Sequence, residues 1–347
     1  MPALLRLLKH RAAGAALALA LLATGGCQPQ SDAATAAAPP PVGHYEGSLV
    51  QAGQPELRIA LDIRHPSPGH YEAEMSAPTA PGLSFVADTV FFSNNQLRLT
   101  RPARSGQSLV LKSEGDFWRG TLAVDSARAT TVLLKRGNAT PNTYHVEEMP
   151  QANGPAWLFA PADAGTLGPA LALLPDSATA GAAPLWADAL AREGIIVLIM
   201  PVAGAATPAT ETPRLQAALR LLRNTPGADT ANVGAWAAGP RAGALAQAVA
   251  PGGPRVAYLI AQNVPVSPEN RAAFRELKNR KLPVLGLYGG PGAAAQAAAL
   301  RNALGGRRGT AVLTYRTSGA DLLVPGGLSR RLGPGLPAGV VEWLRGR

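Results

Sequence analysis

The chain has 347 residues, enough for two domains, and a formal net charge of +10 at pH 7. Its basic residues are scattered and aromatic residues make up only 5% of it. Because it has no basic run with interleaved aromatics, we exclude nucleic acid as a partner. Glycine (38 residues) and proline (32 residues) are frequent throughout, so a single Gly or Pro is weak evidence for a turn or a motif.

The first residues have the pattern of an export signal. Three basic residues lie within positions 1–11, and an apolar stretch over 12–24 follows that is too short to span a bilayer. The only cysteine of the chain, Cys27, comes after two glycines and resembles the end of a bacterial lipoprotein signal, in which the peptide is cut before a lipidated cysteine. We therefore expect a signal peptide over 1–26 and a lipid anchor at the bacterial cell envelope, in the periplasm or outer membrane. Plain secretion and an uncleaved anchor are the alternatives.

Residues 27–41 are rich in alanine and proline and end in three consecutive prolines. A segment of this composition cannot bury a core and stays extended. We expect a tether that holds the rest of the chain away from the membrane.

Residues 42–137 alternate apolar and polar side chains with a period of two. Apolar residues occupy positions 57, 59, 61 and 63, for example, with Arg58 and Asp62 between them. Turn signals divide the region into about eight short strands, expected over 45–50, 57–63, 71–75, 86–92, 97–99, 109–111, 117–124 and 131–134. This pattern predicts a small antiparallel all-β module, either a barrel or a sandwich.

Three histidines of this region, His44, His65 and His70, fall near expected strand ends. A metal site is one interpretation of such a group. No Cys, Asp or Glu accompanies them at ligand spacing, so we expect solvated turn histidines, and we expect no metal and no cofactor.

Residues 138–154 contain two prolines and are expected to form a linker. From 155 to 347 strands alternate with helices, which is typical of a parallel sheet. We expect strands over 157–160, 170–174, 195–200, 233–237, 256–260, 283–288 and 311–315, and helices over 184–192, 214–223, 242–250, 270–278, 293–304 and 339–345.

The stretch 231–249 predicts a buried strand, a tight turn and a helix. A short apolar run over 233–237 is broken by Gly239-Pro240, and the residues from 242 on are rich in Ala and Leu. A strand that enters a helix through a sharp turn is where an α/β-hydrolase holds its nucleophile, in the pattern G-x-S-x-G. The serine is absent here.

The order of elements over 42–347 is similar to that of secreted bacterial α/β-hydrolases of the esterase and acyl-peptidase kind, some of which carry a β module in front. Three stretches carry the resemblance: WADALAREGIIVLIMP, LRNTPGADTANVGAWAAG and KLPVLGLYGG. They match a helix–strand unit, the approach to the elbow and the strand that bears the catalytic acid. The resemblance implies an α/β-hydrolase-like doubly wound, mostly parallel sheet.

The sequence departs from that family at the catalytic positions. The resemblance places Gly239 at the nucleophile, Gly292 at the acid and Asp321 at the histidine. No histidine or cysteine follows position 150, so no base is at hand to activate a serine. The resemblance therefore implies a lost catalytic triad.

A non-standard site would be needed for hydrolysis. Ser177 and Asp176 follow the strand 170–174, in the loop that gives these hydrolases part of their oxyanion hole. They could line a cleft with Gly239, Arg241 and Asp321 at the carboxyl ends of the strands. A strand-ending turn is the simpler interpretation, because Pro-Asp-Ser is good turn chemistry.

Three functions follow from these observations. The leading hypothesis is a catalytically inactive hydrolase homologue that binds a small molecule or a protein at the cell envelope. The alternatives are a weak carboxylic-ester hydrolase built on Ser177 with Asp176 or Asp321, and a purely structural or interaction module. An open cleft near Ser177, Gly239 and Asp321 favours ligand binding there. A cleft filled by side chains favours a purely structural or interaction function.

Overall fold

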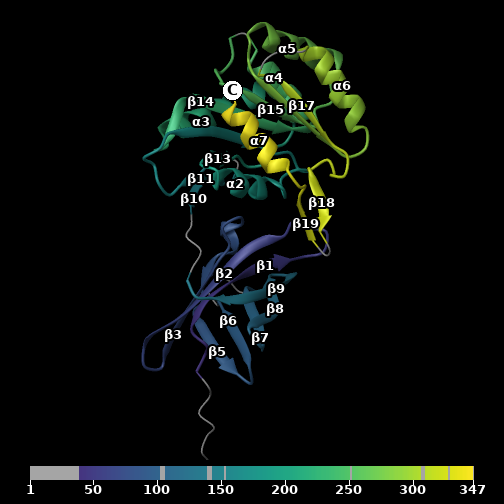
Figure 1. Ribbon diagram of the computed structural model, residues 1–347. Helices are drawn as coiled ribbons and strands as arrows, with labels where there is room; N and C mark the ends of the chain where they lie inside the picture. Colours follow the sequence, from purple (N-terminus) through teal and green to yellow (C-terminus); the bar gives the residue numbers. More distant parts are fainter. Residues whose placement is uncertain are drawn as a thin grey trace, which may run out of the picture.

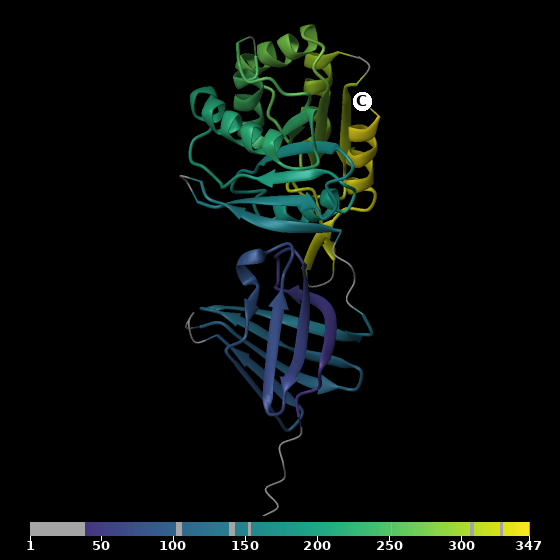
Figure 2. The same ribbon diagram turned by 90° about the vertical axis from the view of Figure 1, so that its left-hand side faces the viewer.

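The computed structural model describes residues 39–101, 106–138, 143–151, 154–250, 252–305, 309–326 and 329–346. A β module and an α/β domain follow each other along the chain and are stacked end to end (Figures 1 and 2). The expected signal peptide and Cys27 lie outside the described residues. No helix in the described part of the chain is long and apolar enough to cross a membrane.

The β module is one antiparallel sheet of nine strands in the order β4-β3-β2-β1-β9-β8-β7-β6-β5. The apolar side chains of the predicted alternation fill its interior, where Leu61, Met75 and Leu97 are fully buried. The strands are β1 (Gly43–Val50), β2 (Leu57–Ser67), β3 (His70–Ser76), β4 (Phe85–Val86), β5 (Thr89–Ser93), β6 (Gln96–Thr100), β7 (Ser108–Glu114), β8 (Phe117–Val124) and β9 (Ala127–Arg136), with a short 3-10 helix, η1 (Pro81–Leu83).

The sheet curls until its two edges meet, so the module is a barrel and not a two-layer sandwich. The single strand expected over 86–92 is in fact two strands, β4 and β5, at opposite ends of the strand order. At the break, the Ala87 N–H donates to Ala73 O of β3 (2.7 Å) and the Asp88 N–H donates to Thr100 O of β6 (3.0 Å). The inward-facing positions shift at this break, from Phe85 and Ala87 to Val90 and Phe92. Exposed apolar residues, Val86 and Phe91, lie on the other face and hide the shift in the sequence.

The α/β domain contains an eight-stranded sheet in the order β10-β11-β13-β12-β14-β15-β16-β17. The pairings of β11 with β10 and β13 are antiparallel and all others are parallel, which confirms the predicted mostly parallel sheet. The strands are β10 (Tyr144–Met149), β11 (Ala156–Pro161), β12 (Gly168–Leu174), β13 (Ile196–Ile199), β14 (Ala228–Ala238), β15 (Leu259–Gln262), β16 (Val284–Gly289) and β17 (Ala311–Tyr315).

Helices cover both faces of this sheet, as predicted for a doubly wound domain (Figure 1). One core lies under α3 to α6 and the other under α2 and α7, where Trp186 and Trp236 pack edge to face with ring centroids 4.8 Å apart. The helices are α2 (Ala183–Ala191), α3 (Pro208–Asn224), α4 (Gly239–Ala248), α5 (Pro268–Asn279), α6 (Ala293–Leu304) and α7 (Leu336–Arg345).

The expected linker over 138–154 contains a strand, because β10 occupies 144–149 and pairs with β11. An edge strand needs only one buried face, and here Tyr144 is buried while His145, Glu147 and Glu148 are exposed. With prolines on both sides, so short and polar a run resembles a linker in the sequence.

A hairpin that the sequence did not reveal, β18 (Leu323–Gly326) and β19 (Ser329–Leu332), reaches from the α/β domain to the β module (Figure 1). The Glu56 N–H donates to Arg330 O and the Arg330 N–H donates to Gln54 O, both at 3.0 Å. These backbone bonds tie the two modules together.

Candidate functional site

The predicted elbow is present at the junction of β14 and α4. Ala238 is still extended, whereas Gly239 has φ +56° and begins the helix. Pro240 occupies the first turn, where its missing N–H costs no helical bond. The backbone is therefore the sharp strand-to-helix turn on which α/β-hydrolases expose a nucleophile, with a glycine in the nucleophile position.

The space above this glycine is filled by Asp176, which follows β12. A Cβ atom placed on Gly239 would lie 2.6 Å from Asp176 Oδ2. The other carboxylate oxygen, Oδ1, is fixed because Thr179 donates to it from its backbone N–H (2.9 Å) and its hydroxyl (2.7 Å). A carboxylate thus stands where a nucleophile side chain would begin.

The elbow also lacks a donor for an oxyanion. In an α/β-hydrolase, the residue after the nucleophile supplies one backbone N–H of the oxyanion hole. That residue is Pro240 here, and proline has no N–H. A negative charge that developed at this place would also face the Asp176 carboxylate, which repels it.

Arg241 does not line a cleft, contrary to the prediction, because its side chain is only 2% exposed. Its Nη2 donates to Ala203 O at 2.8 Å, and its Nη1 lies 3.5 Å from Oε1 of the fully buried Glu211. Burial lowers the pKa of Arg241 and Arg214 lowers it further, while Glu211 and Asp176 act in the opposite direction. The group acts as an internal ion-pair cluster that secures the loop after β13.

Asp321 is held in an ion pair with Arg330. Its two carboxylate oxygens lie 2.6 and 2.7 Å from the guanidinium of Arg330, and its side chain is largely buried. Leu323 N–H also donates to it at 3.2 Å. Its function is to brace the β18–β19 hairpin.

The structure does not bring the other candidate residues into a catalytic arrangement. Ser177 is exposed, and Gly292 caps α6 with φ +77° and open space around it. His145, the last histidine of the chain, lies on β10, four strands from β14, which corresponds to about 19 Å at the usual spacing between strands. Of the predicted cleft, only Asp176 and Gly239 meet, and they fill it.

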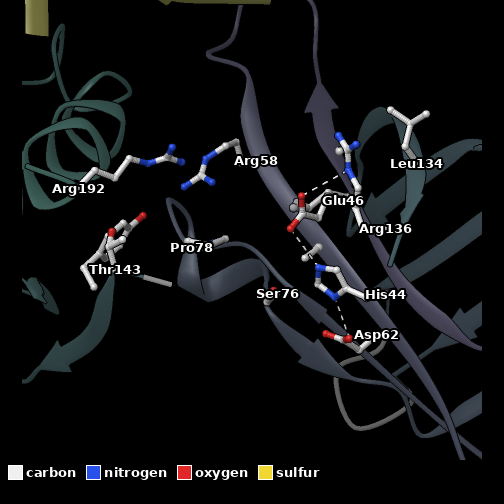
Figure 3. Close-up of a pocket in the computed structure, with 14 residues that line it drawn as sticks. His44, Glu46, Arg58, Asp62, Ser76, Pro78, Leu134, Arg136, Thr143 and Arg192 are labelled. Carbon is white, nitrogen blue, oxygen red and sulfur yellow. Dashed lines mark hydrogen bonds and ion pairs between the residues drawn. The ribbon is translucent and has the colours of Figure 1, made fainter. Parts of the chain in front are cut away.

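A polar cleft that sequence reasoning missed lies between the β module and the α/β domain (Figure 3). It has a volume of about 530 Å³. The outer faces of β1, β2 and β9 form one wall, and residues near β10 and α2 form the other. Its charged and ionisable lining residues are His44, Glu46, Arg58, Asp62, Arg136, Tyr144 and Arg192.

His44 is paired inside this cleft and is not the solvated turn histidine that we expected. Its Nδ1 lies 2.8 Å from Asp62 Oδ1 and its Nε2 lies 3.1 Å from Glu46 Oε1. Burial opposes protonation, but the hydrogen bonds and charges of Asp62 and Glu46 outweigh it, so the pKa of His44 is raised. No group of three His, Cys, Asp or Glu side chains suited to a metal ion occurs among the residues that the structure describes.

Asp188 of α2 joins three groups at the other side of the cleft. Arg58 Nη2 of the β module lies 2.5 Å from its Oδ1, Arg192 Nε lies 3.1 Å from the same oxygen, and the Tyr144 hydroxyl also donates to it. Burial raises the pKa of Tyr144, and Asp188 raises it further. Figure 3 shows Arg58 and Arg192 directed toward each other across the cleft.

Of the two partners of His44, only Glu46 could be predicted from the sequence. Glu46 is two residues from His44, so both side chains must lie on one face of a strand. Asp62 comes from the next strand, directly opposite His44. That pairing depends on register, which alternation alone does not specify.

Comparisons with known proteins bear on the fold only. No protein-family model and no curated protein sequence matches the chain. Among solved structures, a dienelactone hydrolase of Anabaena variabilis is 17% identical, with 59% of this chain and 98% of that chain covered and a TM-score of 0.45. A Klebsiella pneumoniae protein assigned as a dienelactone hydrolase is 14% identical, with 59% and 100% covered and a TM-score of 0.43. Thermogutta terrifontis esterase 2 is 14% identical, with 60% and 94% covered and a TM-score of 0.38.

Proposed function

We propose that this chain is a catalytically inactive protein with an α/β-hydrolase fold, exported to the cell envelope, that binds a small anionic molecule in the polar cleft between its two modules. The observation that carries the proposal is the filled elbow. Gly239 supplies no nucleophile, Pro240 supplies no oxyanion donor, and the Asp176 carboxylate lies where a side chain on Gly239 would begin.

Each of these changes removes a separate requirement of hydrolysis. Loss of the nucleophile or the base alone costs several orders of magnitude in rate, and loss of one oxyanion donor costs about 10²–10³. The chain has no histidine after His145. Ser177 is exposed, and Oδ1 of Asp176 already accepts two hydrogen bonds from Thr179.

The hydrogen-bond donors at the polar cleft favour an anionic ligand. Arg58 and Arg192 are 48% and 43% exposed in their side chains and share the single carboxylate of Asp188 with Tyr144. Each guanidinium has five N–H groups, so donors outnumber the acceptors that Asp188 offers. A carboxylate or phosphate placed between the two arginines would accept the remaining hydrogen bonds in the bidentate geometry that guanidinium groups favour.

The location of the protein is part of the same proposal. The basic first residues, the apolar stretch over 12–24 and Cys27 support export followed by lipidation. The test is metabolic labelling with palmitate in a bacterial host. We expect the parent to carry the label and Cys27→Ala to lose it. An unlabelled parent would overturn the anchor.

Two measurements on the purified full chain test the activity and the ligand. In the first, the parent and Ser177→Ala are assayed on short-chain esters, and we expect both to match buffer. Turnover by the parent that Ser177→Ala abolishes would establish the alternative, a weak hydrolase at Ser177.

In the second, succinate and inorganic phosphate are titrated by calorimetry. We expect binding that Arg58→Gln and Arg192→Gln each weaken about tenfold, which is the value of one charged hydrogen-bonded contact. Arg345→Gln is the matched control, because Arg345 also pairs with an acidic residue, Glu193 (2.9 Å), but lies outside the cleft. Absence of binding, or binding that all three variants retain, would favour a purely structural or interaction module.

A further inference from the structure

A second cavity, of about 380 Å³, lies at the end of the barrel that faces the α/β domain. Its walls are mostly aliphatic: Leu49, Leu57, Leu83, Leu122 and Val124 come from the β module, and Pro184 comes from α2. It shares no lining residue with the polar cleft. The two sites use opposite faces of β2, because Leu57 faces this cavity while Arg58 faces the polar cleft.

One buried hydroxyl in this wall has no hydrogen-bond partner. Thr79 is 1% exposed, and its Oγ1 makes no hydrogen bond. Thr79 also lines an adjoining cavity of about 280 Å³, whose other walls include Trp157 and Phe159. A buried polar atom left unpaired is costly. The Thr79 hydroxyl lies in the wall between two cavities, so a ligand atom that reached it and accepted its hydrogen bond would remove that cost.

The segment that carries Thr79 is firmly held, so the cavity is formed before any ligand enters. Ala77 N–H donates to Ser84 Oγ at 2.9 Å, and Gln107 Nε2 donates to Leu83 O at 3.1 Å. Two backbone turns, from Ala80 to Ala77 and from Leu83 to Ala80, complete the loop. A pre-formed apolar pocket of this size is within the usual range for small-molecule sites.

The rim of the cavity is polar and carries one cation. Gln51, Gln54 and Arg128 are exposed there. Among the residues that the structure describes, Arg128 forms no ion pair, although most other arginines near the module interface do. An aliphatic wall, an unpaired internal donor and a free guanidinium at the mouth are the features that recognise an anionic amphiphile.

We propose that this cavity binds a single-chain acyl ester with an anionic head group. The acyl chain lies along the leucines, the ester carbonyl accepts the hydrogen bond of Thr79 Oγ1, and the head group pairs with Arg128. The site is independent of the anion site in the polar cleft, since the two share no residue.

Three lauroyl compounds distinguish the contribution of the ester from that of the negative charge. Lauroyl lysophosphatidylglycerol has both the ester and the charge, monolaurin has the ester alone, and laurate has the charge without the ester. Each is titrated by calorimetry, below its micelle concentration, into the full chain held in amphipol so that no free detergent competes. We expect the lysophospholipid to bind most tightly.

Two variants identify the contacts. Arg128→Gln should weaken the lysophospholipid and laurate about five- to tenfold and leave monolaurin unchanged, and Thr79→Val should weaken the two esters about fivefold and leave laurate unchanged. Thr79→Val keeps the size of the side chain and removes the unpaired hydroxyl, so the unliganded variant should melt no lower than the parent. Arg119→Gln, on the outer surface beside Glu114, is the control.

Several results would overturn the proposal. Failure of all three compounds to bind would do so, as would binding that neither Arg128→Gln nor Thr79→Val alters. Binding lost in Arg192→Gln would place the compounds in the polar cleft. Since that variant leaves the apolar cavity intact, failure of the acyl-ester site and failure of the proposed anion site are distinguishable.

Discussion

Replacing Gly239 by serine would restore the residue type of a hydrolase nucleophile, yet we expect it to destabilise the protein and to create no esterase. Gly239 has φ +56°, where a residue with a Cβ costs about 1–2 kcal/mol. The new Cβ would also lie 2.6 Å from Asp176 Oδ2, so the carboxylate must move. Moving it weakens the two hydrogen bonds from Thr179, at about 1 kcal/mol each. We expect a total loss of about 3–4 kcal/mol in the free energy of unfolding.

The measurement is urea unfolding followed by tryptophan fluorescence, since Trp236 lies in β14, the strand that leads into the elbow. Gly194→Ser is the matched control, because Gly194 has φ +79° and a Cβ there meets nothing within 4 Å. Gly194→Ser should lower the free energy of unfolding only by the backbone contribution of about 1–2 kcal/mol. In an Asp176→Ala background, Gly239→Ser should lower the free energy of unfolding by no more than Gly194→Ser does.

Two outcomes would refute this reasoning. If Gly239→Ser lowers the free energy of unfolding equally with and without the Asp176 carboxylate, Asp176 does not fill the elbow. Ester turnover by the Gly239→Ser variant would show that the site needs only a nucleophile, and that Pro240 and the missing histidine do not prevent hydrolysis.

The remaining predictions concern the buried arginine and the paired histidine. Arg241→Met should lower the free energy of unfolding by about 3–5 kcal/mol, because it removes one partner of the fully buried Glu211, and a loss below 1 kcal/mol in urea unfolding would contradict it. The pKa of His44 is raised above the unfolded value of about 6.5, so its stabilisation is fully present below pH 6.5 and is lost as the pH rises through the folded value. His44→Gln should therefore destabilise the protein more at pH 6 than at pH 9, and unfolding curves that show the reverse order would exclude a protonated His44 between Asp62 and Glu46.

The alternation of strands and helices in the α/β domain could be predicted from the sequence because buried parallel strands are continuous apolar runs. Ile196–Ile199 and Val284–Gly289 are buried on both faces and were expected within one or two residues. Edge elements follow different rules. β10 and the β18–β19 hairpin bury little, contain prolines or charges, and were missed for that reason.

The glycine at the strand-to-helix turn and the absence of a histidine after position 145 were readable from the sequence, since residue identity is a one-dimensional property. That Asp176 fills the elbow depends on where the ends of β12 and β14 lie, and those ends are 60 or more positions apart in the chain. The sequence placed Asp176 and Gly239 in one cleft but gave no distance between them.

The amino-acid sequence by itself determined that this protein has a β module, a mostly parallel α/β domain and no histidine after position 145, because period, apolar runs and residue types are local properties. Only the tertiary structure decided that the sheet of the β module closes, that Asp62 stands opposite His44, and that Arg58 and Arg192 meet at Asp188. Closure, register and contacts between modules arise from pairings between distant segments, and no local pattern specifies them.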